Sequence, residues 1–521
     1  MSTATVLYDV IIVGAGLSGL AAAYEILSKD SSATVMILEA SHRIGGRNFL
    51  DNGVDKGAGY IGPTQDRIMR LVDVLGLAVY KVYTEGKTVQ YVRGKTTPFD
   101  GTIPPLSAFA LLDLNAAFVE VDRITETINL EQPHLTPNAA ELDSTTVAEF
   151  MRRHCWCEDT VNMMRTCLRA LLGKELCEVS MLGFAWYVRS SGGIKRICET
   201  KDGAQDSKVH GGTGRISIEL AKRLPAEWIQ LNSPVRFINY SSDAAVTVVV
   251  GSASAGGEEK TFTAKTLILA IPPHQHTRIT FTPQLSTNRA ASLAHWPMAS
   301  YTKTFLVYAR PWWREKGFNG SIVGDDGITT TTMDDSKCDG SRWALMGFVL
   351  SAEAAKWSAK TPEERRSALA QHYAKVFDAP EALEVLGYDE KQWADDPWAC
   401  GALAAPVPGA ITKFPGEMFR SQIAPHVFIA GTEAAKLFVG YMDGAVEAGE
   451  RSGRNALVRL GRLPADQFDV VSRPPPSPMM PFVEMAMSYA EKRLVPSVGQ
   501  ALGIVATVAA AAVAFAVWRR K

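Results

Sequence analysis

Residues 8–20 read YDVIIVGAGLSGL, an apolar run that passes directly into three spaced glycines. The run from Tyr8 to Val13 predicts a buried parallel strand, and Gly14 to Leu27 predicts a tight turn that continues as a helix. A second strand is expected at Thr34 to Glu39. Together these elements predict a βαβ unit at the start of the sequence, the unit from which parallel sheets of α/β folds are built.

The glycines of this unit have the spacing G-x-G-x-x-G. Gly14 permits the tight turn, Gly16 lets a pyrophosphate approach the backbone, and Gly19 permits close packing of the helix on the sheet. Glu39 ends the second strand 25 residues after Gly14 and can accept hydrogen bonds from ribose hydroxyls. Ser18 lies within the same loop. Placed between a strand and a helix, these residues predict a dinucleotide-binding site.

Residues 43–47, RIGGR, place two cations around a pair of glycines. A backbone that bends at Gly46 brings Arg43 and Arg47 toward the diphosphate of the nucleotide. Combined with the glycine motif and Glu39, this pattern resembles the fingerprint of the flavin amine oxidase superfamily, and the resemblance implies FAD as cofactor. That superfamily also contains desaturases and protoporphyrinogen oxidase. The fingerprint therefore indicates FAD more firmly than it indicates an amine substrate.

Further along, the chain resembles the monoamine oxidases at several motifs, which occur in the order found in that family. The motifs are Gly57–Gln65, Phe184–Val188, Met298–Lys303, Tyr388–Trp393, Phe428–Glu433 and Gly440–Gly449. The resemblance implies a two-domain, mixed α/β fold in which a discontinuous Rossmann-like FAD domain is interrupted by a substrate domain. It also implies cofactor contacts at Gly59, Tyr60, Trp393, Gly431, Glu433 and Met442.

The same resemblance implies two catalytic residues. In monoamine oxidases a lysine hydrogen-bonds a water beside the reactive N5 nitrogen of the flavin, and Lys303 stands at the matching position. Tyr441 matches one of two tyrosines that face each other across the flavin ring and align the substrate amine. Gln205 falls at a position that lines the substrate cavity. The implied reaction converts a primary or secondary amine to an aldehyde, ammonia and hydrogen peroxide, with oxygen as electron acceptor.

The substrate end departs from the family. The second caging tyrosine is replaced by Leu403 or Ala404, depending on the direction from which residues are counted. A tyrosine that divides the family's cavity corresponds to Thr331, and apolar lining residues correspond to Ala170 and Cys198. These replacements predict a wider pocket that lacks half of its aromatic cage, so the substrate cannot be taken over from the mammalian enzymes.

The covalent flavin link of the mammalian enzymes is also expected to be absent. A cysteine within an S-G-G-C-Y motif carries that link, and the corresponding positions here are Ala402 or Leu403, which have no nucleophile. Cys400 lies two or three residues short of the expected place. Noncovalent FAD is therefore predicted, held by the contacts of the nucleotide cradle.

The length of 521 residues predicts at least two packed domains. The FAD-binding domain is expected at residues 1–80, 211–295 and 395–460, and the substrate domain at 81–210 and 296–394, including a helical stretch at 147–172. Residues 461–493 contain RPPPSP and predict an extended leash. Residues 494–521 predict a C-terminal transmembrane helix, since 501–518 are uncharged and span about 27 Å as a helix. The resemblance places such an anchor in the mitochondrial outer membrane, with the catalytic part facing the cytosol.

Composition narrows the partners. With 54 basic and 55 acidic residues the formal charge is -1, which excludes the basic footprint of a nucleic-acid-binding protein. The seven cysteines have no metal-site spacing, so no metal is expected. The expected partners are a small amine, oxygen and a membrane, and a homodimer is compatible with the sequence. The alternatives are a polyamine or amino-acid oxidase, a desaturase, or a flavin-bearing membrane scaffold without turnover.

Overall fold

The computed structural model describes residues 6–101, 104–251, 259–324, 326–417 and 422–471. The N-terminal apolar run forms β1 (Leu7–Val13), which pairs in parallel with β2 (Val35–Leu38). The connecting helix α1 (Leu17–Lys29) packs on the last described long helix, α14 (Met442–Arg459). Glycine makes this contact close: a Cβ at Gly449 would lie 2.2 Å from the carbonyl oxygen of Ser18. The predicted βαβ unit is therefore present and is covered by a helix from the far end of the chain.

A nine-stranded sheet is built around β1 and carries the order β13-β10-β11-β12-β1-β2-β9, with β20 also paired to β12 and β19 to β20. Its further strands are β9 (Ile229–Gln230), β10 (Val235–Ser242), β11 (Ala245–Val250), β12 (Lys260–Leu269), β13 (Thr280–Thr282), β19 (Gln422–Ala424) and β20 (Val427–Ile429). β12 pairs in parallel with both β1 and β20, so strands far apart in sequence share one buried sheet. Both of its faces are apolar, as expected for parallel strands covered by helices.

A seven-stranded sheet has the order β18-β14-β17-β16-β15-β6-β7. Its strands are β6 (Lys87–Val92), β7 (Lys95–Phe99), β14 (Tyr301–Tyr308), β15 (Phe318–Gly324), β16 (Thr331–Asp334), β17 (Trp343–Leu350) and β18 (Gly387–Gln392). Two short pairs, β3 (Leu50–Asp51) with β4 (Val54–Asp55) and β5 (Val79–Lys81) with β8 (Ser207–Val209), complete the strands of the described residues.

Helices fill the remaining layers. The other α-helices are α2 (Asp66–Val74), α3 (Ala108–Thr127), α4 (Ala139–Ser144), α5 (Val147–His154), α6 (Glu158–Leu172), α7 (Met181–Ser190), α8 (Ile194–Cys198), α9 (Arg215–Ala221), α10 (Thr287–Ala294), α11 (Trp312–Glu315), α12 (Ser351–Ser358) and α13 (Pro362–Val376). Short 3-10 helices are η1 (Pro133–Leu135), η2 (Leu176–Glu178), η3 (Ala226–Trp228), η4 (Pro273–Arg278), η5 (Pro380–Leu383), η6 (Thr432–Ala434) and η7 (Ala465–Gln467).

The helical stretch expected at residues 147–172 is interrupted. It forms α5 and α6, with an extended segment between them at residues 155–157. The buried carboxylate of Asp113 accepts hydrogen bonds from the backbone N–H groups of Trp156 and Cys157, at 2.8 to 3.1 Å. A side chain from another helix therefore supplies the acceptors that a continuous helix would have used.

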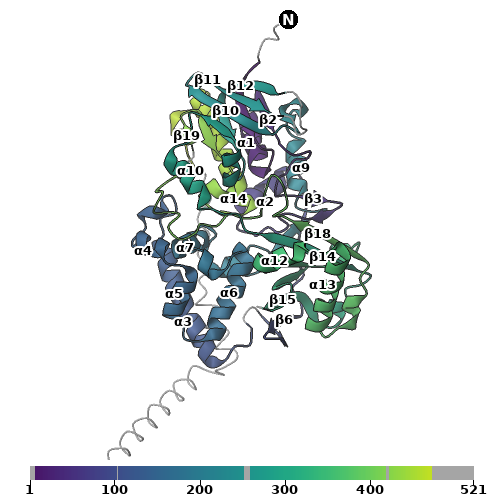
Figure 1. Cartoon of the computed structure of the whole chain (residues 1–521). Helices are drawn as coiled ribbons and strands as arrows, with labels where there is room; N and C mark the ends of the chain where they lie inside the picture. The colour runs from purple at the N-terminus through teal and green to yellow at the C-terminus, as the bar shows by residue number, and fades with distance from the viewer. Residues whose placement is uncertain (1–5, 102–103, 252–258, 325, 418–421, 472–521) are drawn as a thin grey trace, which may run out of the picture.

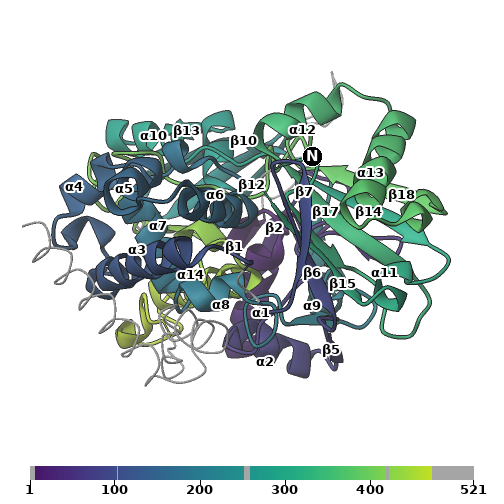
Figure 2. The same ribbon diagram turned by 90° about the horizontal axis from the view of Figure 1, so that it is seen from below.

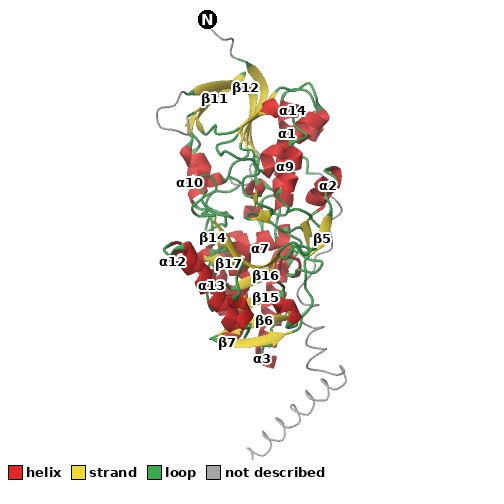
Figure 3. Ribbon diagram, turned by 90° about the vertical axis from the view of Figure 1, so that its right-hand side faces the viewer, coloured by secondary structure: helices red, strands yellow, loops and turns green. Residues whose placement is uncertain are grey.

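The parts meet around one central region. Figure 1 shows the nine-stranded sheet with α1 and α14 in the upper half, and the helices α3 to α7 at the lower left. In the view from below, the helices α3 to α6 lie on the left and the seven-stranded sheet lies on the right (Figure 2). The side view places β14 to β17 below the level of α9 and α10 (Figure 3). Loops at the inner ends of both sheets therefore converge.

Two sequence predictions lie partly or wholly outside this description. Among the described residues, no helix is both long and apolar enough to cross a membrane. The predicted anchor at 494–521 and most of the predicted leash at 461–493 lie outside the described residues. The exact domain boundaries stay a prediction.

Candidate active site

A cavity of about 430 Å³ opens between the two sheets and the helical layer. The predicted cofactor residues line it, except Gly19 and Glu433, and so do Lys303 and Tyr441. Of the predicted substrate residues, Gln205, Leu403 and Ala170 line it, whereas Thr331 and Cys198 do not. The fold thus gathers most of the predicted site from segments that are hundreds of residues apart.

The glycine turn forms one end of the cavity. Gly14 has a φ of +104°, and a Cβ there would lie 2.8 Å from the carbonyl oxygen of Ala270 on the neighbouring strand end. A Cβ at Gly19 would lie 2.0 Å from the carbonyl oxygen of Gly14. Gly16 differs, because no atom lies within 4 Å of an added Cβ. Gly14 and Gly19 are thus needed for the close approach of neighbouring backbone segments, whereas Gly16 leaves open space beside the cavity for a ligand.

Glu39 stands beside this turn and organises it. Its carboxylate accepts hydrogen bonds from the backbone N–H groups of Ala15 (2.7 Å) and Ser41 (2.8 Å). Burial raises the pKa of Glu39, although the two N–H groups oppose this shift. Each carboxylate oxygen keeps further acceptor capacity, so Glu39 can receive the hydroxyls of a ribose.

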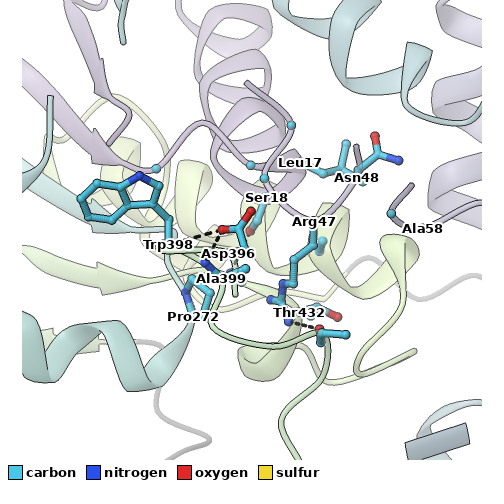
Figure 4. Close-up of a pocket in the computed structure, with 18 of the residues that line it drawn as sticks. Leu17, Ser18, Arg47, Asn48, Ala58, Pro272, Asp396, Trp398, Ala399 and Thr432 are labelled. Carbon is cyan, nitrogen blue, oxygen red and sulfur yellow. Dashed lines mark hydrogen bonds between the residues drawn. The ribbon is translucent and has the colours of Figure 1, made fainter. Parts of the chain in front are cut away.

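The two arginines of the RIGGR segment have different partners. Arg47 makes two hydrogen bonds to the buried carboxylate of Glu433, at 2.6 and 3.0 Å, and a third to the carbonyl oxygen of Ala402. Arg43 donates to the carbonyl oxygen of Gly46 and lies 3.8 Å from the ring centre of Phe49. In Figure 4, Arg47 extends toward the segment that carries Thr432. The charge of Arg47 is thus directed to Glu433, which itself does not line the cavity.

Two further hydrogen bonds join the N-terminal segment to the C-terminal motifs. Ser18 Oγ accepts a bond from the N–H of Gly431 at 2.8 Å. Asn48 Nδ2 donates to the sulfur of Met442 at 3.3 Å. These bonds hold Gly431 against the start of α1 and Met442 against the segment that follows RIGGR. They account for the position of Gly431 and Met442 in the cavity wall.

Lys303 projects from β14 into the cavity and is 3% exposed. Its ammonium donates to the carbonyl oxygens of Asp55 (2.7 Å) and Gly57 (3.0 Å). Burial lowers the pKa of Lys303 to about 8, although the carboxylates of Asp335 and Asp55 oppose this shift. A protonated lysine carries three N–H groups, so one donor is left for a water or ligand in the cavity.

Several buried charged side chains lie near the ammonium group of Lys303. Lys208 forms a buried ion pair with Asp335, which also accepts hydrogen bonds from Arg342 and from the hydroxyl of Tyr60. The pKa of Asp335 is lowered by these cations in spite of its burial. The ring of Tyr60 therefore stands between the cavity and a paired charge network.

Three tyrosines and a phenylalanine form the opposite end. The rings of Tyr187 and Tyr441 are stacked, with centroids 6.0 Å apart and planes 12° apart, and the Tyr187 hydroxyl donates to that of Tyr441 at 2.8 Å. Tyr301 meets Phe348 edge to face at 5.7 Å. Tyr301 and Lys303 are two residues apart on β14 and Phe348 is opposite Lys303 on β17, so all three share one face of the sheet. Sequence reasoning did not single out Tyr187, Tyr301 or Phe348 as site residues.

The positions of the remaining substrate residues follow from local packing. Leu403 reaches over Gly440, where an added Cβ would lie 2.5 Å from the leucine methyl. Thr331 pairs with Phe348 across β16 and β17 but does not line the cavity, which β16 reaches through Met333. Cys198 contacts Cys167 instead of the cavity. Gln205 donates to the carbonyl oxygen of Ile197 at 3.3 Å.

The space expected beside Ala170 is taken up by another side chain. The hydroxyl of Tyr301 donates to the carbonyl oxygen of Ala170 at 3.3 Å. Its ring packs on Gly173, where a Cβ would lie only 2.2 Å from the ring. The end of α6, where the residues are small, is therefore packed against the large side chain of Tyr301 from β14. The only sign in the sequence that the space beside Ala170 would be filled is the bulky Tyr301, two positions before Lys303.

The segment from Trp393 to Leu403 closes the cavity. The indole N–H of Trp393 donates to the carbonyl oxygen of Lys56, and Asp396 accepts bonds from the N–H groups of Trp398 and Ala399 (Figure 4). Cys400 does not line the cavity, and its sulfur accepts bonds from Gln275 and Arg278. Ala402 and Leu403 line the cavity instead.

The donor set fits an organic cofactor. Among the described residues no cluster of three or more histidine, cysteine, aspartate or glutamate side chains could hold a metal ion. Open space beside Gly16, the acceptor oxygens of Glu39 and the apolar wall beyond them suit a dinucleotide with a flat ring system.

Comparisons with known proteins agree with this geometry. Residues 17–457 match the family model described as flavin containing amine oxidoreductase. The chain is 35% identical over 522 residues to amine oxidase [flavin-containing] B of Sus scrofa, covering 98% of each chain, and 35% identical over 507 residues to amine oxidase [flavin-containing] A of Equus caballus, covering 96% of this chain and 94% of that one. The solved cyclohexylamine oxidase from Brevibacterium oxydans IH-35A superposes with a TM-score of 0.81 at 29% identity, over 88% of this chain and 100% of its own. The chain therefore belongs to the family of flavin containing amine oxidoreductases.

Proposed function

We propose that this protein is an FAD-dependent amine oxidase that deaminates a neutral monoamine with an apolar side chain. The observation that carries the proposal is one continuous cavity with the glycine turn and Glu39 at one end, the tyrosine wall at the other, and Lys303 in its lining. Family membership supports the oxidoreductase class, FAD and amine oxidation. The structure of this chain supports the narrower substrate class.

Bound FAD would be held by the glycine turn, Glu39 and the RIGGR segment, and it would supply the redox chemistry that converts the amine and oxygen to the aldehyde and hydrogen peroxide. The overall balance is RCH₂NH₂ + O₂ + H₂O → RCHO + NH₃ + H₂O₂. The protein positions the amine against the ring face of Tyr441, whose hydroxyl is engaged by Tyr187. Lys303 holds a water or oxygen by its remaining donor.

The cavity wall supplies no general base at the tyrosine end. Burial raises the pKa values of Tyr187, Tyr301 and Tyr441 well above their ordinary range, so all three stay neutral phenols. The enclosing aromatic rings exclude water and favour an uncharged amine. The substrate is therefore oxidised in its neutral form without proton removal by a side chain.

Charge placement argues against polyamines. The acidic residues that line the cavity are Glu39 and Asp396, and both have polar partners at the nucleotide end. A second ammonium group at the tyrosine end would meet aromatic and apolar side chains without a carboxylate. Putrescine oxidase is a structural relative at 27% identity and a TM-score of 0.80, over 87% of this chain and 100% of its own. Its substrate is not the one we propose here.

An amine panel tests the function. We expect amine-dependent peroxide release with monoamines, including long or bulky ones, because Leu403, which lines the cavity, leaves more room than a caging aromatic residue would. The Leu403→Tyr variant is expected to lower the ratio of kcat/KM for long over short amines by about tenfold, which corresponds to about 1.4 kcal/mol. Absence of peroxide with every amine would support a flavin-bearing scaffold instead. A preference of the wild type for benzylamine with long amines rejected would contradict the wide pocket.

We expect FAD to be bound without a covalent bond. Ala402 and Leu403 offer no nucleophile at the cavity wall, and the sulfur of Cys400, which does not line the cavity, accepts hydrogen bonds from Gln275 and Arg278. Precipitation with trichloroacetic acid should leave the yellow flavin in the supernatant. Ala402→Cys is the matched control, because it puts a thiol at a lining position, and part of its flavin should enter the pellet. A yellow wild-type pellet whose flavin peptide contains Cys400 would show that the link exists.

We propose further that residues 494–521 anchor the protein in a membrane, in the mitochondrial outer membrane with the catalytic part in the cytosol. The support is the uncharged run of 501–518 behind the RPPPSP segment, and similarity to the flavin-containing amine oxidases B and A over 98% and 94% of their lengths. Deleting 494–521 should release the enzyme into the soluble fraction. Flavin content and kcat should stay unchanged within about twofold, because Ala445 is the last residue in the sequence that lines the cavity. Sedimentation of the truncated protein with membranes in alkaline carbonate would place the attachment elsewhere.

A further inference from the structure

Two cysteines touch beside the active site. Cys167 on α6 and Cys198 at the end of α8 have their sulfur atoms 3.0 Å apart, and both residues are half-buried. All seven cysteines of the chain are free thiols in the described structure, and this is the pair whose sulfurs are in direct contact. Contact between two thiols from separate helices makes this pair a candidate site of disulfide formation.

Both helices reach the substrate end of the cavity. On α6, Ala170 and Leu171 line the cavity within about one turn of Cys167. On α8, the carbonyl oxygen of Ile197, directly before Cys198, accepts the hydrogen bond from the cavity residue Gln205. A bond between the two sulfurs would therefore join the two segments that flank this side of the pocket.

We propose that Cys167 and Cys198 form a peroxide-driven disulfide that lowers the affinity of the enzyme for its amine. The proposal rests on the proposed function, because amine oxidation would release hydrogen peroxide near these thiols. The first step is RSH + H₂O₂ → RSOH + H₂O at Cys167, in which the sulfur is oxidised and the peroxide O–O bond breaks. In the second step the sulfur of Cys198 attacks the sulfenic sulfur, the S–S bond forms, and water leaves.

The neighbouring environment sets this order. The hydrogen bond with Cys167, followed by burial, raises the pKa of Cys198 well above its ordinary range. Because the thiolate is the reactive form, Cys198 is the poorer first nucleophile. It is the resolving thiol because its sulfur already lies 3.0 Å from that of Cys167. Thiol reductants would restore both thiols and thus reverse the change.

The disulfide changes the position of α8 more than that of α6. A disulfide bond is about 2.05 Å long, so the sulfurs must approach by about 1 Å. α8 has only five residues and follows Gly192 and Gly193, both at positive φ, whereas α6 has fifteen residues in the packed helical layer. The shift of α8 displaces the acceptor of Gln205. We expect KM to rise by at least about threefold with kcat nearly unchanged, because binding geometry and not electron transfer is altered.

The test uses the purified, flavin-loaded full chain after reduction and removal of the reductant. In the first arm, hydrogen peroxide is added without amine, and non-reducing peptide mass spectrometry is combined with amine kinetics after catalase treatment. A linked Cys167–Cys198 peptide with the expected KM increase, reversed by dithiothreitol, supports the proposal. In Cys167→Ser, KM should stay at its value before peroxide treatment. Cys177→Ser, which removes an exposed cysteine, should show the same rise in KM as the wild type.

Absence of the linked peptide after added peroxide, or a linked peptide without a KM change, overturns the proposal. The second arm replaces added peroxide by amine turnover in air, with and without catalase. Formation of the link with added peroxide but never during turnover supports the thiol site and shows that the proposed peroxide production has failed. The two arms therefore separate the fate of the thiol pair from that of the proposed activity.

Discussion

Gly16→Ala is expected to yield a folded protein that purifies with almost no flavin. No protein atom lies within 4 Å of a Cβ at this position, and the backbone there is extended with a φ of -68°, so alanine causes no clash in the protein itself. The methyl group would instead occupy the space that a pyrophosphate needs beside the glycine turn. We expect FAD affinity to fall by at least about 100-fold, or about 2.7 kcal/mol. The measurement is a flavin titration of the apoprotein, with circular dichroism as the test of folding.

Gly19→Ala is the matched comparison three residues along the same motif. Its Cβ would lie 2.0 Å from the carbonyl oxygen of Gly14, which is backbone and cannot move aside cheaply. We therefore expect this variant to be insoluble or unfolded, while the melting temperature of Gly16→Ala matches that of flavin-stripped wild type. Stoichiometric flavin in Gly16→Ala would show that the diphosphate lies elsewhere.

Lys303→Met is expected to keep FAD but to slow reoxidation of the reduced flavin by about 100-fold. Lys303 is held by two backbone carbonyls at the cavity wall, so it can present a positive charge where oxygen is reduced. Preorganised charge of this kind contributes about 10²-fold to 10³-fold to a step in which negative charge develops. Stopped-flow traces of the two half-reactions measure the effect. An unchanged reoxidation rate would remove Lys303 from this role.

The rate of flavin reoxidation should depend on pH in the wild type but not in Lys303→Met. The pKa of Lys303 is lowered from 10.5 to about 8, so the charged form is lost as pH rises through about 8. Reoxidation in the wild type should therefore slow across that range, while the rate in Lys303→Met should stay flat. Since the folded pKa lies below the unfolded value, burial of the charged lysine opposes folding most fully below about pH 8. The free energy of unfolding of the wild type should therefore rise relative to that of Lys303→Met as pH increases from about 8 to 10.5.

Local patterns were sufficient to predict that the glycine turn and Glu39 lie together at one end of the cavity. The apolar run before Gly14 predicts a buried strand, and the glycine spacing predicts a helix that packs closely on it; the structure has both. Glu39 is placed by the end of the next parallel strand, because the carboxyl ends of neighbouring parallel strands lie at one edge of a sheet. These are contacts within about 30 residues, so their geometry is encoded in short-range spacing.

The substrate half depended on contacts that no local pattern contains. The partner of Arg47 is Glu433, and the stack on Tyr441 is made by Tyr187. Likewise Tyr301 fills the space that Ala170 was expected to leave. A residue's type shows that it can bind a carboxylate or pack on a ring, but the choice of partner is made when distant strands and helices are brought together.

By itself, the sequence determined the βαβ unit, the dinucleotide cradle and the position of Lys303 within its motif. The tertiary structure alone decided that Arg47 is neutralised by Glu433, that Cys167 meets Cys198, and how large the pocket is. The physical reason is that backbone turns and strand ends are set by steric limits between near neighbours. The filling of a cavity is instead set by the volumes of all side chains that reach it, and these come from segments hundreds of residues apart.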